Sequence, residues 1–84
     1  MEVSREVLTV LESALNLRGR AASFGRDTPL LGAVPELDSL AVVSVITSLE
    51  ERFGFVVEDD DIDGATFATV GSLVAFVEGK IKGV

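Results

Sequence analysis

Ser39 is the residue of this sequence that offers chemistry most directly. It follows Asp38 and precedes Leu40 at the start of the longest apolar-periodic stretch, so its hydroxyl should lie at the opening of a helix. The first N–H groups of a helix lack intrahelical partners and lie at the positive end of the helix dipole, which favours a phosphate there. We therefore predict that Ser39 is a modification site, with Asp38 capping or orienting the helix opening. The simpler alternative is that Ser39 is only a helix cap.

The composition argues against the usual forms of catalysis by this serine. The chain contains no histidine and no cysteine, which excludes a Ser-His-Asp triad and a thiol nucleophile. A serine–lysine arrangement remains open, but the two lysines, Lys80 and Lys82, lie near the C-terminus. We therefore expect a protein that is not an enzyme.

An acidic stretch offers a second kind of chemistry, the binding of calcium. Asp59, Asp61, Asp63 and Gly64 match the first half of an EF-hand loop, in which carboxylate oxygens converge on the ion. The last ligand position, which should be a bidentate glutamate, is Val70. The sequence therefore predicts a solvated acidic surface with no dedicated metal site, although the run could collect divalent ions weakly.

The net charge of −7 is concentrated in one part of the chain. Residues 36–63 contain nine acids and a single base, Arg52, so we expect an acidic field around Ser39 and after it. Such a field repels nucleic acid and anionic membranes and favours basic protein surfaces. Surface charge of this kind can also do no more than keep a small domain soluble.

The size and composition favour one small domain over residues 1–84. With 84 residues, 48% of them hydrophobic, the chain can build a single core stabilised by apolar packing, because it has no cysteine for disulfides or zinc–thiolate sites. Its first residues lack the charged n-region and the continuous apolar core typical of a signal peptide, and no stretch approaches the roughly 20 apolar residues that span a bilayer. We expect a cytoplasmic monomer without membrane insertion.

The first expected element is an amphipathic helix over residues 4–17. Ser4 is the expected cap and Gly19 the expected stop. Its inward-facing residues are predicted to be Val7, Leu8, Leu11, Ala14 and Leu15.

Residues 18–37 contain three glycines and two prolines and should form a long loop. Its expected apolar anchors are Phe24, Leu30, Leu31, Val34 and Leu37. Its arginines should be solvated, although one of them could pair with acids of a neighbouring helix; they are Arg18, Arg20 and Arg26.

The second helix should run from Asp38 or Ser39 to Phe53 and stop at Gly54. Its β-branched residues would favour a strand on propensity alone, but its length and the terminal glycine favour a helix. The predicted core side chains are Val42, Val45, Ile46, Leu49 and Phe53.

After an extended connector at residues 55–57, the acidic run 58–64 could form one or two helical turns packed by Ile62. Thr69 should cap a last helix. The inward-facing residues of that helix are predicted to be Val70, Leu73, Val74, Val77 and Ile81. The expected fold is all-α, a small four-helix bundle with three principal helices, one short helix and a long first loop.

Nearly the whole chain, from the first helix through Thr69-Val70, resembles a known family. Leu37-Asp38-Ser39-Leu40, followed by a helix that ends Leu49-Glu50-Glu51-Arg52-Phe53-Gly54, is similar to acyl carrier proteins of the phosphopantetheine-binding superfamily. Thr69-Val70 matches the entry to the family's last helix.

The resemblance implies that Ser39 receives 4′-phosphopantetheine from coenzyme A through a separate transferase, the holo-synthase. The thiol of the arm would carry acyl groups as thioesters, as is typical in fatty acid and lipid metabolism. Asp38 and Leu40 would flank the cofactor site, and an acyl-loading ligase and acyl-transfer enzymes would be partners.

The resemblance also implies a partner-binding face on the second helix. Its expected residues are Leu40, Ala41, Ser44, Ser48 and Glu51. Carriers of fatty acid synthesis typically show more carboxylates on this row, so docking here should depend more on shape than on electrostatic steering. This departure favours a specialised lipid, polyketide or exopolysaccharide pathway. Residues 30–39 also resemble stand-alone carriers associated with exosortase and exopolysaccharide systems.

Three other interpretations remain open on the sequence. The chain could be an aminoacyl or peptidyl carrier, although its acidity argues modestly against this. It could be an acidic helical adaptor that binds a protein and has no prosthetic group, or a weak calcium-responsive module.

Overall fold

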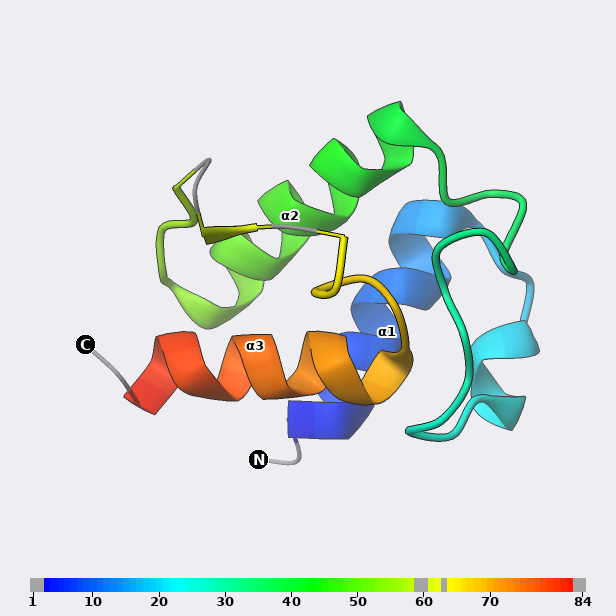
Figure 1. Ribbon diagram of the computed structural model, residues 1–84, viewed down its shortest axis with the longest axis horizontal. Coiled ribbons are helices and arrows are strands. Elements are labelled where there is room, and N and C mark those ends of the chain that lie inside the picture. The colour runs from blue at the N-terminus through cyan, green and yellow to red at the C-terminus, as the bar shows by residue number, and fades with distance from the viewer. Residues whose placement is uncertain (1–2, 59–60, 63, 83–84) are drawn as a thin grey trace.

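A computed structural model describes residues 3–58, 61–62 and 64–82 of the chain. The elements are α1 (Val3–Leu15), the 3₁₀ helix η1 (Arg20–Ser23), α2 (Ser39–Phe53) and α3 (Val70–Lys82). The described residues form no strand, only an isolated antiparallel bridge between Pro29 and Thr69. α1 packs against both α2 and α3 (Figure 1). The all-α prediction is therefore confirmed.

The bounds of α1 differ from the predicted 4–17 at both ends. The helix already includes Val3, so Ser4 is not its cap. It ends at Leu15 because Asn16 adopts a left-handed conformation with φ 53°, which asparagine tolerates better than most residues. The N–H of Leu17 then donates to the Glu12 carbonyl at 3.1 Å, as in a Schellman motif. Asn16 therefore ends the helix, and the predicted stop at Gly19 is wrong.

The long loop between α1 and α2 contains the one short helix that the described residues form, η1. Leu30, Val34 and Leu37 are buried anchors as predicted, and Phe24 is half-buried. Leu31 is 49% exposed, so the prediction for it is wrong: Leu30 next to it already fills the core. Backbone hydrogen bonds also hold this loop to the segment that leads into α3, for example from the Leu30 N–H to the Ala68 carbonyl at 3.0 Å.

α2 has the predicted bounds. Gly54 adopts a left-handed φ of 76°, and its N–H donates to the Glu50 carbonyl at 2.8 Å, which ends the helix. Val45 and Leu49 are fully buried. The other predicted core residues of this helix pack on the core while partly exposed; they are Val42, Ile46 and Phe53. Burial of this apolar face outweighs the strand propensity of its β-branched residues.

The connection from α2 to α3 begins with the Phe53 and Phe55 rings stacked at 5.9 Å. Ile62 is partly buried against the core, as predicted. Asp61 lies in a 3₁₀ conformation, but Asp59, Asp60 and Asp63 of the acidic run lie outside the described residues. The predicted short helix at 58–64 therefore falls only in part on described residues.

α3 begins with the predicted cap. The N–H of Ser72 donates to Thr69 Oγ1 at 3.1 Å, and the N–H of Thr69 donates to Ser72 Oγ at 3.0 Å, which is a reciprocal capping box. The inward-facing residues through Val77 are buried, but Ile81 is 37% exposed because it lies one turn beyond the end of the core. The prediction for Ile81 is therefore wrong.

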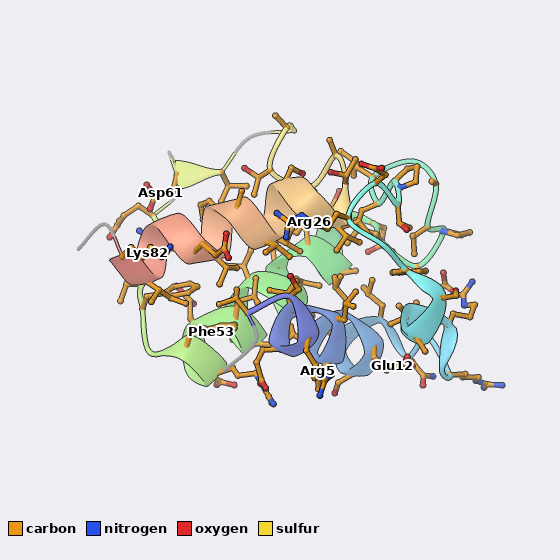
Figure 2. The ribbon with its side chains drawn as sticks, turned by 90° about the horizontal axis from the view of Figure 1, so that it is seen from below. Arg5, Glu12, Arg26, Phe53, Asp61 and Lys82 are labelled. Carbon is orange, nitrogen blue, oxygen red and sulfur yellow. The ribbon has the colours of Figure 1, made fainter. Side chains whose placement is uncertain are left out.

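The core also contains four buried residues that the sequence pattern did not single out: Val10, Leu17, Ala21 and Phe67. Arg26 lies beside the N-terminal end of α3, and Asp61 beside its C-terminal end (Figure 2). In the part of the chain that the structure describes, no helix has both the length and the apolar character needed to span a bilayer.

Candidate functional site

Asp38 lies at the N-terminal end of α2, directly before its first helical residue. This residue has an extended backbone with φ −106° and ψ −174°, and its Oδ1 accepts a hydrogen bond from the Ala41 N–H at 2.8 Å. Its carbonyl accepts from the Val42 N–H at 2.9 Å, which starts the helical hydrogen-bond ladder. Asp38 is therefore the N-cap, as predicted, and Ser39 is the first helical residue and not the cap.

Ser39 is exposed on the surface of the protein. Within the described residues, its hydroxyl makes no hydrogen bond, and it lines none of three surface hollows of about 260, 370 and 470 Å³. The N–H groups of Ser39 and Leu40 precede the start of the helical ladder at Val42. A hydroxyl on an open surface beside free N–H groups suits attachment of a phosphate better than catalysis in a cleft.

The structure leaves this serine without a nearby lysine. The Lys80 ammonium donates to Asp61 Oδ2 at 2.9 Å. Lys80 and Lys82 lie in the last turns of α3, at the end of the molecule away from the first turn of α2 (Figure 1). The serine–lysine arrangement that the sequence left open therefore does not form between these elements.

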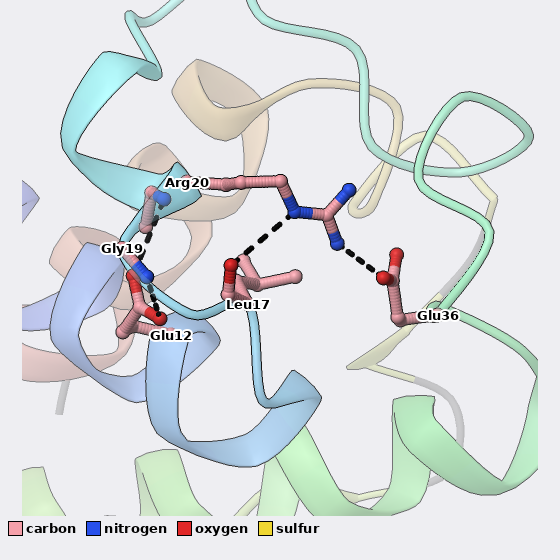
Figure 3. A network of polar contacts seen from close by, with 6 residues as sticks. Glu12, Leu17, Gly19, Arg20 and Glu36 are labelled. Carbon is pink, nitrogen blue, oxygen red and sulfur yellow. Dashed lines mark hydrogen bonds and ion pairs between the residues drawn. The ribbon is translucent and has the colours of Figure 1, made fainter.

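The segment that precedes Ser39 is tied to the rest of the loop. Val34 and Leu37 bury their side chains in the core. Glu36 forms an ion pair with Arg20 of η1, so an arginine of the loop pairs with an acid of the same loop and not with a neighbouring helix (Figure 3). These contacts fix the chain immediately before the candidate site.

The predicted partner-binding row is only partly on the solvent side of α2. Leu40 is 80% exposed, and Ser44 and Glu51 are exposed, but Ala41 and Ser48 are half-buried. The solvent side also includes two residues that the predicted row omitted, Val43, which is 60% exposed, and Thr47. Leu40, Val43 and Thr47 are spaced three and four residues apart, so they lie on one face of the helix. A partner-binding row that started at Leu40 with this spacing would have included Val43 and Thr47.

The charges near Ser39 differ from the acidic field that the sequence suggested. Glu36 is paired with Arg20, and Asp38 caps the helix. Glu50 and Glu51 lie about 16 to 18 Å from Ser39 along the helix axis, at 1.5 Å per residue. Glu50 accepts a hydrogen bond from the Val57 N–H at 2.8 Å. The first turns of α2 therefore present apolar and hydroxyl side chains, with the carboxylates at the far end.

The described residues do not support a calcium site in the acidic run, whose sequence matches the first half of an EF-hand loop. Asp61 Oδ2 accepts from the Glu58 N–H at 2.9 Å and from Lys80, so this carboxylate is already engaged. Asp59 and Asp63 lie outside the described residues. Among the residues that are described, no three His, Cys, Asp or Glu side chains gather where they could hold a metal ion.

Three comparisons with known proteins agree on one family. The family model for the phosphopantetheine attachment site matches residues 5–77. The solution NMR structure of a holo acyl carrier protein from Nitrosomonas europaea is 49% identical, with a TM-score of 0.89 over 96% of this chain and 98% of that one.

An acyl carrier protein from Exiguobacterium sp. (strain ATCC BAA-1283 / AT1b) is 41% identical over 44 residues. That match spans 52% of this chain and 53% of the relative, about half of each. The family model covers most of the chain and includes Ser39. The chain therefore belongs to the phosphopantetheine-binding carrier family, whose prosthetic group is 4′-phosphopantetheine.

Proposed function

We propose that this protein carries acyl groups on a 4′-phosphopantetheine arm attached to Ser39. The observation that carries the proposal is the exposed Ser39 hydroxyl, free of hydrogen bonds within the described residues, on the first residue of α2 while Asp38 makes the cap. The similarity to a holo acyl carrier protein supports it. When bound, the arm supplies a thiol that forms thioesters, chemistry for which the chain itself has no cysteine.

The residues around Ser39 fit a phosphodiester. The N–H groups of Ser39 and Leu40 and the helix dipole favour an anion at this position. The Asp38 carboxylate would oppose a second negative charge, but its Oδ1 is held on the Ala41 N–H at 2.8 Å. The segment before it adds no free carboxylate, because Glu36 is paired with Arg20.

The attachment step requires a separate phosphopantetheinyl transferase. Ser39 Oγ would form a bond to the phosphorus that bears pantetheine in coenzyme A, and adenosine 3′,5′-bisphosphate would leave. Since the chain has no histidine and Ser39 has no lysine beside it, the transferase would take up the hydroxyl proton. In this proposal the chain is a substrate and a carrier, and not an enzyme.

We also propose the class of partners. An acyl-loading ligase and acyl-transfer enzymes would dock on the solvent side of α2 near Ser39, where Leu40 and Ser44 are exposed. The low charge of this surface favours a specialised lipid, polyketide or exopolysaccharide pathway. The protein would act as a cytoplasmic monomer and bind no nucleic acid.

Intact mass spectrometry after co-expression with a broad-specificity transferase tests the proposal. Wild type is expected to gain the mass of one phosphopantetheine, and Ser39→Ala none. Ser44→Ala is the matched control, an exposed serine of the same helix, and should gain the arm as wild type does. A wild type without added mass would favour the adaptor interpretation, and an Ser39→Ala variant that gains the arm would overturn the site.

A further inference from the structure

The loop before α2 contains a set of polar contacts that lie outside the hydrogen bonds of the α2 cap. They involve Glu12 of α1, Arg20 of η1 and Glu36, three residues before Ser39 (Figure 3). We call these three residues the loop clamp. We propose that the loop clamp positions Ser39 for its transferase.

Glu12 fixes the start of η1. Its Oε2 accepts from the Gly19 N–H at 2.7 Å, and its Oε1 accepts from the Ala21 N–H at 3.3 Å. Both peptide groups lie directly beside Arg20 in the chain, so one carboxylate of α1 holds the backbone on both sides of Arg20. This backbone also includes Arg18 with a positive φ angle of 56°, a conformation that costs energy for a residue other than glycine.

Arg20 then connects η1 to the segment that enters α2. Its Nε donates to the Leu17 carbonyl at 3.3 Å, which orients the guanidinium, and its Nη2 pairs with Glu36 Oε2. The Glu36 carbonyl accepts from the Asp38 N–H at 3.2 Å, and Asp38 caps α2. An unbroken series of contacts therefore runs from α1 to the residue that sets the position of Ser39.

The buried side chains of Val34 and Leu37 do not by themselves fix the orientation of the segment before α2. Val34 and Leu37 hold the segment against the core, but contacts between aliphatic side chains have little directional preference. An arginine–carboxylate pair is directional, because the guanidinium presents its N–H groups in a rigid plane. The inference rests on the proposed function, since positioning matters for the reaction only if Ser39 receives the arm.

The size of the expected effect follows from the exposure of the pair. Exposed ion pairs contribute about 0.2–1 kcal/mol, which corresponds to a change of roughly 1.4- to 5-fold in an equilibrium. We therefore expect Arg20→Ala and Glu36→Ala each to lower kcat/KM for arm transfer by about 1.4- to 5-fold. The double variant should lose little more than either single variant, because both remove the same contact.

The charge-reversed pair Arg20→Glu with Glu36→Arg separates positioning from direct contact with the transferase. It should restore kcat/KM toward wild type if the ion pair positions Ser39, and it should not if Arg20 or Glu36 touches the transferase. Arg18→Ala is the matched control, an exposed arginine of the same turn. Unchanged rates in the single variants, failure of the reversed pair, or an equal loss in Arg18→Ala would overturn the inference.

A measurement on the protein without the arm keeps the two proposals distinguishable. Amide hydrogen exchange of Leu37 and Ala41, whose N–H groups bond to the Val34 carbonyl and to Asp38, should quicken in Arg20→Ala and recover in the reversed pair. If wild type gains no arm, the proposed function fails while this exchange still tests the clamp. Exchange rates equal to wild type in Arg20→Ala would contradict it.

Discussion

At the opening of α2, two adjacent side chains have separate tasks. Asp38 accepts from the Ala41 N–H, which leaves the Ser39 hydroxyl free of hydrogen bonds to the described residues. If Ser39 were the cap, converting its hydroxyl to a phosphodiester would disturb the cap whenever the arm was added. With the cap on Asp38, a phosphodiester on Ser39 would leave the hydrogen bond from the Ala41 N–H to Asp38 Oδ1 in place.

Replacement of Asp38 tests whether Asp38, and not Ser39, caps α2. Asp38→Ala should lower the free energy of unfolding by about 1 kcal/mol, because the Ala41 N–H loses its acceptor, and Asp38→Asn should recover most of it. Urea denaturation of the protein without the arm measures both. A loss as large in Ser39→Ala as in Asp38→Ala would mean that the serine also caps the helix.

The free energy of unfolding should depend on pH through the carboxyl group of Asp61. The Glu58 N–H, and then the Lys80 ammonium, hold the pKa of Asp61 below its ordinary value of 3.8. Because the pKa is lowered in the folded protein, the stabilisation is present above the unfolded pKa and is lost as pH falls through the folded pKa.

Asp61→Asn should therefore destabilise the protein at pH 7 and have little effect once the pH lies well below about 3.8, where wild type is also uncharged at this position. Urea denaturation of both proteins at several pH values measures the difference. A difference that does not change with pH would show that the charge of Asp61 contributes nothing.

The residue types near Ser39 made much of the site predictable. An acid and a serine before an apolar-periodic stretch indicate a serine hydroxyl at the opening of a helix, and the structure has it there. The pairing of Arg20 with Glu36 was not predictable, because it depends on how the loop folds back on α1. The exposure of Leu31 and Ile81 was missed because apolar character alone does not tell which side chain extends beyond the core.

Among the elements, the long loop and α3 are joined by an unusually close backbone approach. The Gly71 N–H donates to the Arg26 carbonyl at 2.7 Å, and a Cβ added at Gly71 would lie 2.9 Å from that oxygen. Gly79 lies in the same helix with open space around it. The two glycines therefore lie in different surroundings, although both belong to the same helix.

Alanine substitutions at Gly71 and Gly79 should have opposite effects on the free energy of unfolding. Gly71→Ala should lower the free energy of unfolding by about 1–3 kcal/mol, because the methyl group forces the loop away from α3. Gly79→Ala should raise it by up to about 1 kcal/mol, because alanine favours helix over glycine. Thermal or urea unfolding measures both changes, and stabilisation by Gly71→Ala would contradict the close approach.

Helix identity was predictable from the sequence, and helix ends less so. The apolar period and Gly54 gave the bounds of α2, and Thr69 gave the start of α3. The end of α1 was misplaced because Asn16, and not a glycine, adopts the left-handed conformation. The 3₁₀ helix η1 has no apolar period, and it depends on hydrogen bonds from its backbone to Glu12 of α1.

For the molecule as a whole, the position of the acids matters more than their number. α2 spans about 22 Å, at 1.5 Å per residue, of a molecule whose longest dimension is 32 Å. Ser39 and Leu40 are at one end of this helix, and Glu51 is near the other. Beyond the cap residue Asp38, the first turns of α2 therefore present apolar and hydroxyl side chains.

We expect docking of the transferase to depend more on Leu40 than on Glu51. Leu40→Ala should lower kcat/KM for arm transfer by about fivefold, because part of its apolar area is buried on docking. Glu51→Gln should change it by less than about twofold, since an exposed, screened charge contributes little. Steady-state kinetics at low and high salt measure both, and a larger effect of Glu51→Gln would contradict this account.

Localisation of the added mass within the chain tests whether the arm is attached to Ser39. The purified, modified protein can be digested with trypsin, which releases Asp27–Arg52 as a single peptide that also contains Ser44 and Ser48. Fragmentation by electron transfer then assigns the added mass to one residue. We expect the whole mass of phosphopantetheine on Ser39, and the same mass on Ser44, Ser48 or another residue would rule out attachment at Ser39.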